Sequence, residues 1–497
     1  MHFRLTSSAK CGNITLAEGG LQMNNAVIRL DGISIHNFKN VVDGSIELSG
    51  KKRGMKASIL GLYGQNGSGK TAMIDAIQLL QYALQGKSIP AQFADCIHVD
   101  AAYSSLSFSF VVNNRYGTYH AIYSFSLRKE KDETAQNSTA DVETASYRAC
   151  LFDEELKCSF ESEKEKVRLT PLMNTKTDDI FIPRSKYKLL VGAGKTVATD
   201  LLVAKRITAA TSRSFLFSRE LLSVIRTNQQ KADQPEEALW YMELISNLVA
   251  FGNHELFIIN TANSGLISLN AQPLAFKYEE KNMGAFGTIA VSLEGPSVVP
   301  VEATAVVRKV IDSMNIVLQQ IVPGLTIQVM SLGTQLMDNG KPGERIQLLS
   351  LKNKKAIPLK YESEGIKKII SILQLLIVVY NQPSMTVAVD ELDSGVFEYL
   401  LGEILRIIAE KGKGQLIFTS HNLRPLETLD KSFIAFTTTN PENRYLRMTN
   451  VKENNNLRDL YYRGIMLGEQ SEELYEPTNN AEIALAFHEA GEVTVTR

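Results

Sequence analysis

One segment, Gly64-Gln65-Asn66-Gly67-Ser68-Gly69-Lys70-Thr71, constrains the fold more than any other part of the chain. It fits the pattern G-x-x-x-x-G-K-[ST], whose glycines let the backbone wrap a phosphate group and direct its N–H groups inward. An apolar run over 57–63 predicts a strand before it, and apolar residues at helical spacing predict a helix over 71–84. The alternative is an ordinary glycine-rich turn, which does not require a strand before it and a helix after it. The sequence therefore predicts a phosphate-binding loop between a strand and a helix.

The loop residues have separate expected roles. The N-terminus of the following helix adds partial positive charge where a phosphate would bind. Lys70 is expected to reach the β- and γ-phosphates and to assist catalysis, while the Thr71 hydroxyl is expected to bind Mg²⁺. The expected ligand is therefore ATP with Mg²⁺. The residues of the loop predicted to bind it are Gly64, Asn66, Gly67, Ser68, Gly69, Lys70 and Thr71.

Two later strands end in residues suited to the same chemistry. An apolar run over 385–389 leads into Asp390, which is expected to hold Mg²⁺, and Glu391, which is expected to polarise the attacking water. The run over 415–419 leads into His421, which would lie at the same carboxyl edge of the sheet and contact the γ-phosphate. A solvated strand end or a structural histidine would explain either one alone. Together with the phosphate loop, they predict a hydrolytic site.

Ser363 and Gly365 lie just before a helix predicted over 366–380. Ser363 could simply cap that helix, or the serine and the backbone N–H groups near Gly365 could bind a phosphate. A second Gly-Lys-Thr, at 194–196, lacks a strand–loop–helix setting and is interpreted as a coincidence.

The remaining patterns predict the fold class and the domains. Alternating strands and helices in the last third favour an α/β fold with a parallel sheet covered on both faces, as in a P-loop ATPase head with a mixed sheet. Both ends of the chain would build this head, over 26–128 and 340–497. Residues 129–339 would form an inserted α+β or helical lobe without a sustained heptad pattern. Residues 1–25 read as a loose, patternless extension, and Met23 is a candidate start.

Composition excludes some function classes. The formal net charge of the 497 residues is -1, so any contact with DNA would need a local basic patch. The four cysteines show neither metal-ligand pairing nor disulfide density, which is typical of reduced thiols in a cytoplasmic protein. The longest apolar run, near 372–380, is too short to span a bilayer, and the first residues lack the apolar core of a signal peptide.

The order of these motifs resembles the heads of ABC-type ATPases of the RecF and structural-maintenance-of-chromosomes group. The stretch Ile33-Ser34-Ile35-His36-Asn37-Phe38-Lys39-Asn40 is similar to their opening strand, and 390–393 and 419–422 resemble bacterial AAA-like ATPases near the overcoming-lysogenization-defect family. Three features depart from these families. Ser-Glu-Gly stands where Ser-Gly-Gly is usual, Gln92 is only a weak candidate for the glutamine loop, and the acidic cluster of a Toprim nuclease is missing.

The resemblance implies how such a chain would act. In the family, the Ser-Gly segment completes the nucleotide site of a second subunit, so Ser363 and Gly365 would contact ATP bound by a partner head in a homodimer or higher oligomer. Many relatives are phage-defence components, which implies a regulatory ATPase controlling a separate nuclease or toxin. The alternatives are a RecF-type DNA-repair ATPase, a slowly hydrolysing nucleotide-gated scaffold and, least favoured, the motor of a membrane transporter.

Overall fold

The computed structural model describes most of the chain. The described residues are 2–4, 14–18, 26–48, 57–131, 147–192, 194–231, 234–260, 271–280, 283–292, 295–337, 340–353, 355–448, 456–467 and 472–492. Cys11 and the candidate start at Met23 lie outside these ranges, and so do Lys51-Lys52-Arg53-Gly54, which the sequence predicts to form a charged turn.

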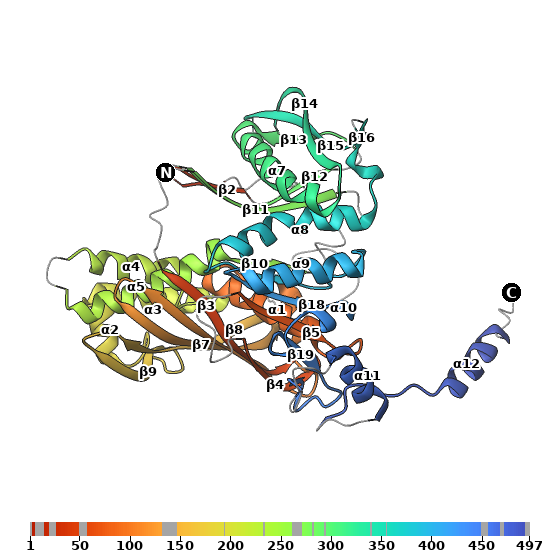
Figure 1. Cartoon of the computed structure of the whole chain (residues 1–497). Coiled ribbons are helices and arrows are strands. Elements are labelled where there is room, and N and C mark those ends of the chain that lie inside the picture. Colours follow the sequence, from red (N-terminus) through yellow and green to blue (C-terminus); the bar gives the residue numbers. More distant parts are fainter. Residues whose placement is uncertain are drawn as a thin grey trace, which may run out of the picture.

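A six-stranded sheet carries the motifs and runs in the order β10, β17, β18, β5, β19 and β20 (Figure 1). The first five strands are parallel, and only β20 runs antiparallel. The α/β fold with a mixed sheet is therefore confirmed. The bounds, in the same order, are Leu256–Ile259, Thr386–Val389, Gln415–Thr419, Ser58–Tyr63, Ile434–Thr437 and Tyr445–Leu446.

The central sheet separates two apolar cores because successive side chains of a strand point to opposite faces. In β5, Leu60 and Leu62 join the core that contains α1 (Lys70–Leu84). Ile59 and Tyr63 join the other core, with α8 (Glu364–Asn381) and α9 (Glu398–Lys411). Burial on both faces explains why these strands are continuously apolar rather than alternating.

A second sheet, fully antiparallel, lies beyond α1 in the order β4, β3, β6, β7, β8 and β9. In that order its strands are Val41–Glu47, Val27–Phe38, Tyr103–Asn114, Gly117–Lys131, Tyr147–Glu161 and Lys166–Asn174. A group of helices shares its core. These are α2 (Arg184–Leu190), α3 (Lys195–Ala210), α4 (Arg219–Gln229) and α5 (Glu236–Ala250), with the short turns η1 (Ala91–Cys96) and η3 (Phe251–Glu255).

Two smaller sheets lie above α8 in Figure 1. One joins β13, β15 and β14, with β16 on β15, and packs on α7 (Val301–Ile321). The other runs in the order β1, β2, β12 and β11. The strands of the first are Ser297–Pro300, Pro342–Lys352, Leu325–Leu336 and Lys355–Pro358; those of the second are His2–Arg4, Ile14–Glu18, Met283–Ser292 and Ala271–Glu280.

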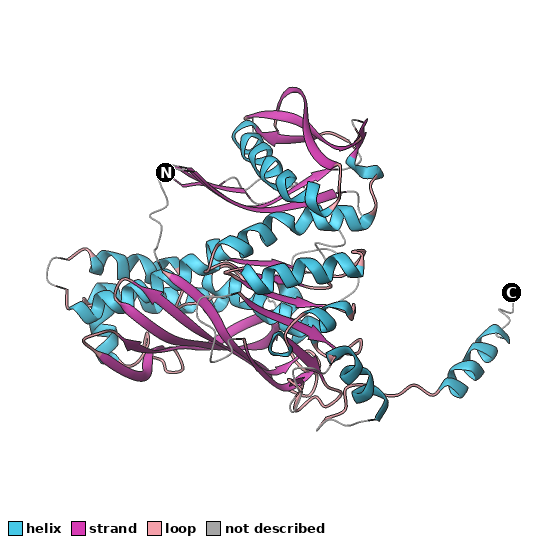
Figure 2. Cartoon of the chain, viewed as in Figure 1, coloured by secondary structure: helices cyan, strands magenta, loops and turns pink. Residues whose placement is uncertain are grey.

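The remaining elements are short helices and turns, namely η4 (Leu359–Tyr361), α10 (Arg424–Thr428), η5 (Lys431–Phe433), α11 (Leu457–Leu467) and α12 (Asn480–Glu492). The two nearest the C-terminus, α11 and α12, are cyan in Figure 2. In the described residues, none of the helices has both the length and the apolar character needed to cross a membrane.

The structure places three features differently from the sequence-based expectation. The boundary expected at 128/129 falls inside β7, whose sheet continues to β9, and the one at 339/340 falls between the paired strands β14 and β15. Strand β10, inside the expected lobe, pairs with β17 in the central sheet. The patternless extension contributes β2, which pairs with β12. Such short strands depend on their neighbours more than on their own pattern.

Candidate nucleotide-binding site

The phosphate-binding loop connects β5 to α1, as the sequence predicts. Gly64 has a φ of 154°, and a Cβ atom there would lie 1.9 Å from Thr437 Oγ1, so only glycine fits. Gly69 has a φ of 93° and is the N-cap of α1. No side chain caps α1, so its first N–H groups are available to an anion.

Lys70 is the first residue of α1 and is largely buried. Its Nζ donates 2.8 Å hydrogen bonds to the carbonyl oxygens of Gly64 and Gln65, which fixes the ammonium inside the loop. Burial lowers the pKa of Lys70, and the nearby carboxylates Asp390 and Glu391 act in the opposite direction. Phosphate oxygens would exchange with these carbonyl acceptors and give charge-assisted hydrogen bonds.

A cavity of about 340 Å³ opens beside this loop. It brings together the loop and the two carboxyl strand ends, because parallel strands present their carboxyl ends at one edge of a sheet. Of the predicted residues, Gly64 and Ser68 belong to the loop but do not line the cavity. Its lining residues are Lys39, Asn40, Asn66, Gly67, Gly69, Lys70, Thr71, Ala72, Asp390, Glu391, Thr419 and His421.

Ser68 supports the loop from behind. Its Oγ donates a 2.6 Å hydrogen bond to the Gln65 carbonyl and also contacts the Thr437 hydroxyl at the end of β19. Ser68 therefore lies on the protein side of the loop. In this structure its hydroxyl stabilises the loop and does not face the cavity.

Asp390 directly follows β17 and is 1% exposed. Its Oδ1 accepts a 2.6 Å hydrogen bond from the Thr419 hydroxyl, while its Oδ2 is buried without a hydrogen-bond partner in the described residues. A buried carboxylate oxygen needs a compensating cation or donor. Together with the Thr71 hydroxyl in the same cavity, this is an oxygen-rich donor set of the kind that Mg²⁺ prefers. The residues present fit the metal.

Glu391 lies beside Asp390 at the mouth of the cavity. Its φ is 49°, a left-handed conformation that is rare for a residue other than glycine or asparagine. The backbone N–H of Glu391 donates a 2.7 Å hydrogen bond to the Thr419 hydroxyl, which holds this turn. Strained backbone of this kind persists where the surroundings over-determine it, and it gathers at functional sites.

His421 follows β18 and lines the same cavity. Its backbone N–H and that of Asn422 donate to Asp393 Oδ2 at 3.1 and 3.0 Å, so Asp393 fixes the turn. Burial and the positive charge of Lys70 lower the pKa of His421, although the three acids nearby oppose the shift. The imidazole is therefore largely neutral near pH 7 and could donate a hydrogen bond to a phosphate oxygen.

Ser363 and Gly365 lie apart from this cavity. Ser363 is the N-cap of α8, and its Oγ accepts a hydrogen bond from the N–H of Ile366 at 3.4 Å. A Cβ on Gly365 would lie 2.0 Å from the carbonyl oxygen of Gly395, so packing within the chain already requires this glycine. Contact with a nucleotide bound by another copy stays a prediction. Gln92 is an exposed residue of the turn η1 and does not line the cavity either.

Sequence reasoning missed several residues of the site. Lys39 and Asn40 line the cavity from the turn between β3 and β4, and Lys39 forms an ion pair with Asp75 of α1. The Thr419 hydroxyl donates a hydrogen bond to Asp390 Oδ1 and accepts one from the backbone N–H of Glu391. The charged residue after the opening strand was the available signal for Lys39.

The phosphate loop lies within a segment that matches a known protein family. Residues 33–187 match the family model of the AAA domain. A search of curated proteins found no match. Among solved structures, the SMC head domain from Thermotoga maritima is 14% identical, with 84% of this chain and 99% of that chain covered and a TM-score of 0.37. The recombination mediator RecF, described with ATP in the RecFOR pathway, is 14% identical, with 80% and 94% covered and a TM-score of 0.32.

An SMC head bound to the C-terminal domain of ScpA, from Pyrococcus furiosus, is 10% identical, with coverages of 85% and 96% and a TM-score of 0.35. These values are too low to support conclusions about activity or partners. The fold assignment rests on the parallel sheet, on the loop between β5 and α1, and on the match to the AAA domain. The chain has the α/β fold of a P-loop ATPase.

Proposed function

We propose that this protein binds and hydrolyses ATP and uses the cycle to regulate a separate effector in the cytoplasm. The observation that carries the ATPase assignment is the single cavity lined by the phosphate loop, Asp390, Glu391 and His421. Each residue type suits one requirement of phosphoryl transfer: anion binding, metal binding, water activation and charge stabilisation.

The chain's own groups would divide the work as follows. The loop N–H groups and Lys70 bind the phosphates and orient them. Glu391, at the mouth of the cavity, accepts the proton of the attacking water, and neutral His421 donates to the γ-phosphate. Mg²⁺, held by Thr71 and Asp390, would neutralise charge on the phosphates. Thr419 positions both acids through its single hydroxyl.

We further propose that two heads associate when ATP is bound, so that Ser363 of one copy contacts the γ-phosphate held by the other. Ser363 lies outside its own chain's cavity and begins an 18-residue helix, whose N-terminal end favours anions. A two-fold arrangement would make the two sites equivalent.

The variant Ser363→Arg tests this association. We expect it to reduce ATP-dependent dimerisation and turnover at least about tenfold, because a long cation replaces the small cap at the contact. Sedimentation velocity with and without ATP, in a Glu391→Gln background that preserves bound ATP, gives the measurement. Ser432→Arg, on η5, is the matched control. Unchanged association and turnover in Ser363→Arg would show that this segment only caps α8.

The effector is proposed to be a nuclease or toxin, with antiphage defence as the favoured setting. This proposal rests on the family resemblance and on the fact that the recognised chemistry is confined to one ATPase cavity. ATP hydrolysis acts on another molecule only by changing shape, because γ-phosphate contacts order or release neighbouring segments. The helices and strands of 129–339 are the proposed docking platform.

Purification of the native protein from its host at low salt tests the regulatory role. We expect a nuclease or toxin to co-purify and to be released by nucleotide or by Lys70→Ala, with Lys411→Ala, at the exposed end of α9 and outside the proposed platform, as the control. ATP turnover of the complex is measured in parallel. Degradation of nucleic acid by the isolated chain, surviving removal of contaminants, would overturn the separate-effector proposal. Absence of turnover with every partner would favour the nucleotide-gated scaffold.

A RecF-type role in DNA maintenance is the second candidate. The exposed Lys352 and Lys355 lie close together at the β15–β16 turn and could contact phosphates, although such groups are usually just solvated. Stimulation of ATP turnover by DNA, lost in Lys352→Glu with Lys355→Glu, would favour this candidate over an effector-controlling ATPase.

A further inference from the structure

Helix α12 has an apolar stripe that nothing in the described part of the chain covers. Every residue from Glu476 to Ala490 is exposed, and Figure 1 shows the helix standing away from the body. Ile483, Ala486, Phe487 and Ala490 recur at the i, i+3, i+4, i+7 spacing of one helix face. Phe487 is 79% exposed. A 13-residue helix is marginal in water by itself, so this stripe needs a partner surface.

A cavity of about 430 Å³ lies beside α2 and α3, and none of its lining residues lines the nucleotide cavity. It is formed by the segment before α2, by α2 and by the first half of α3. Apolar side chains make most of its wall, and charged residues, among them three cations, surround them. The apolar lining residues are Ile180, Phe181, Tyr187, Ala198 and Leu202; the charged ones are Arg184, Lys188, Lys195, Asp178 and Asp179.

The walls of this cavity are held in place by interactions that do not involve a ligand. Lys205 of α3 donates to the carbonyl oxygens of Thr175, Thr177 and Asp179 at 3.0, 2.7 and 2.7 Å, which joins α3 to the segment before α2. Lys186 of α2 forms an ion pair with Glu237 of α5. A cavity fixed in advance costs little ordering when a side chain enters it.

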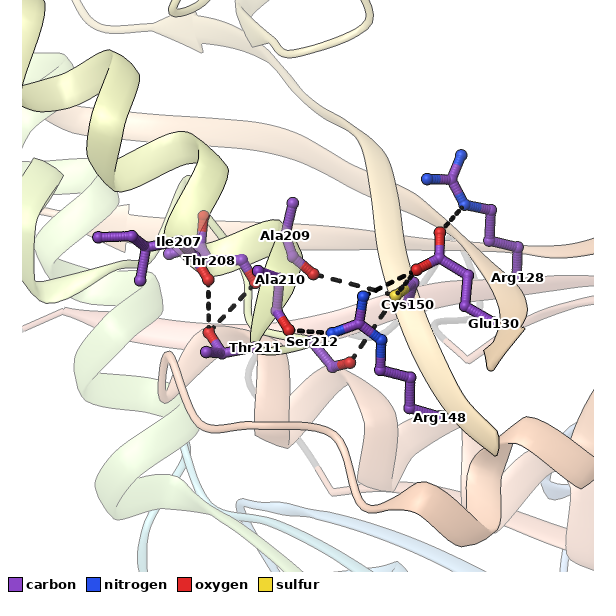
Figure 3. Close-up of polar contacts among 10 residues, drawn as sticks. All are labelled: Arg128, Glu130, Arg148, Cys150, Ile207, Thr208, Ala209, Ala210, Thr211 and Ser212. Atoms are coloured by element: carbon purple, nitrogen blue, oxygen red, sulfur yellow. Dashed lines mark hydrogen bonds and ion pairs between the residues drawn. The ribbon is translucent and has the colours of Figure 1, made fainter. Parts of the chain in front are cut away.

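The far end of α3 is fixed by a polar cluster on β7 and β8 (Figure 3). Arg148 donates to the carbonyl oxygen of Ala210, at the C-terminal end of the helix, where a cation is favourable. Glu130 accepts from Arg128 at 2.6 Å, from Arg148 at 2.9 Å and from the Cys150 thiol at 2.8 Å. Burial raises the pKa of Cys150 to about 11, so this thiol is a structural donor.

Residues 472–492, which end in α12 and are called the arm below, are attached far from the α2–α3 cavity of their own chain. The carboxylate of Glu472 accepts hydrogen bonds from Asn440 and Asn443 at 3.0 and 2.9 Å. The N–H of Glu476 donates to Oε1 of Gln65, in the phosphate loop, at 3.0 Å. Helix α12 begins four residues later, and Figure 1 places α2 and α3 on the opposite side of the molecule.

We propose that α12 of one copy docks in the α2–α3 cavity of a second copy, with Phe487 as the buried anchor. Two acids, Glu482 and Glu489, lie seven residues apart and therefore flank the same side of the apolar stripe. The cations Lys188 and Lys195 at the cavity face them with opposite charge. An aromatic anchor in a desolvated pocket, surrounded by complementary charges, is the usual composition of an interface hot spot.

This contact is independent of the ATPase proposal because it uses no residue of the nucleotide cavity. If each of two copies docks its α12 in the other, a closed two-fold dimer forms. If each copy docks its α12 in the next copy only, open head-to-tail assemblies form. In either arrangement a single contact needs one intact α12 and one intact α2–α3 cavity, and two different copies supply them. Two variants, each lacking one of these, should therefore complement each other.

Sedimentation velocity of the full chain without nucleotide tests the proposal. Phe487→Asp removes the anchor and Leu202→Glu places a charge in the cavity; both positions are exposed, and circular dichroism checks that folding is retained. We expect each to weaken self-association at least about tenfold, as loss of a central apolar anchor does. Ile316→Asp, at a position 73% exposed on α7, is the matched control and should associate like the unaltered chain.

The decisive measurement mixes the two variants. A 1:1 mixture of Phe487→Asp and Leu202→Glu retains one intact arm and one intact cavity, so we expect a heterodimer that neither variant forms alone. An unaltered chain that stays monomeric at about 100 μM would overturn the proposal. So would a Phe487→Asp variant that associates normally, or a mixture without heterodimer.

Discussion

Replacing Lys70 by alanine is expected to weaken ATP binding about a hundredfold while the fold is retained. The ammonium makes two hydrogen bonds, both to loop carbonyls, and would make charge-assisted bonds to phosphate in their place. Such bonds contribute about 1.5–3 kcal/mol each, so the loss of one corresponds to about tenfold to about a hundredfold in affinity, and the loss of two to at least about a hundredfold. Isothermal titration with Mg-ATP gives the affinity, and thermal unfolding reports on the fold.

The matched control is Lys195→Ala, since Lys195 belongs to the second Gly-Lys-Thr and begins α3, a helix that follows α2 rather than a strand. We expect its ATP affinity to equal that of the unaltered chain. If Lys70→Ala bound ATP normally, the loop at 64–71 would not be the nucleotide site. If Lys195→Ala lost binding instead, the interpretation of the two Gly-Lys-Thr segments would have to be exchanged.

The central sheet could be predicted from the sequence because its strands are buried on both faces. The runs at 57–63, 385–389 and 415–419 are apolar without alternation, and turn residues or helical patterns bound each one. Strand β10 has four residues, Leu256–Ile259, and a short apolar run of this length does not distinguish a strand from part of a helix. It joins the sheet only because β17 offers it a parallel edge.

The antiparallel sheet that runs from β4 to β9 shows a different limit of prediction from the sequence. Strands β6 and β7 largely alternate buried and half-buried residues, which is the local pattern typical of a strand with one covered face. Whether their sheet ends there depends on long-range pairing, since β9 is added only through β8 and contains two register shifts. A local pattern contains no information about such pairing, which is why the expected boundary at 128/129 falls within a strand.

Of the residues that line the cavity, the sequence predicts those whose spacing a motif fixes and misses those that only the fold brings together. Asp390 and His421 follow strands that the sequence predicts, so their common edge could be inferred. Thr419 was read only as the end of a strand, yet its hydroxyl donates to Asp390 and accepts from the N–H of Glu391. Lys39 enters the cavity because β3 pairs with β4 beside α1, a contact that no motif encodes.

Replacing Glu391 by glutamine is expected to slow ATP hydrolysis at least about a hundredfold while Mg-ATP still binds. Loss of a positioned general base costs about 10² to 10⁴ in rate. Glutamine keeps the size and the left-handed backbone of Glu391, so the strain at this turn is unchanged and only the proton acceptor is lost. Single-turnover hydrolysis and titration of Mg-ATP, measured on the same preparation, separate the chemical step from binding.

Asp390→Asn should behave differently, because Asp390 is buried with an oxygen that has no hydrogen-bond partner among the described residues. The amide keeps the bond from Thr419 but weakens a Mg²⁺ ligand, so we expect a higher Mg²⁺ requirement rather than a uniform loss of rate. Glu398→Gln, in the first turn of α9 and outside the lining of the cavity, controls for the loss of one exposed carboxylate. Wild-type turnover in Glu391→Gln would assign the base to another residue, and His421, neutral at pH 7 and in the same cavity, would be the next to replace.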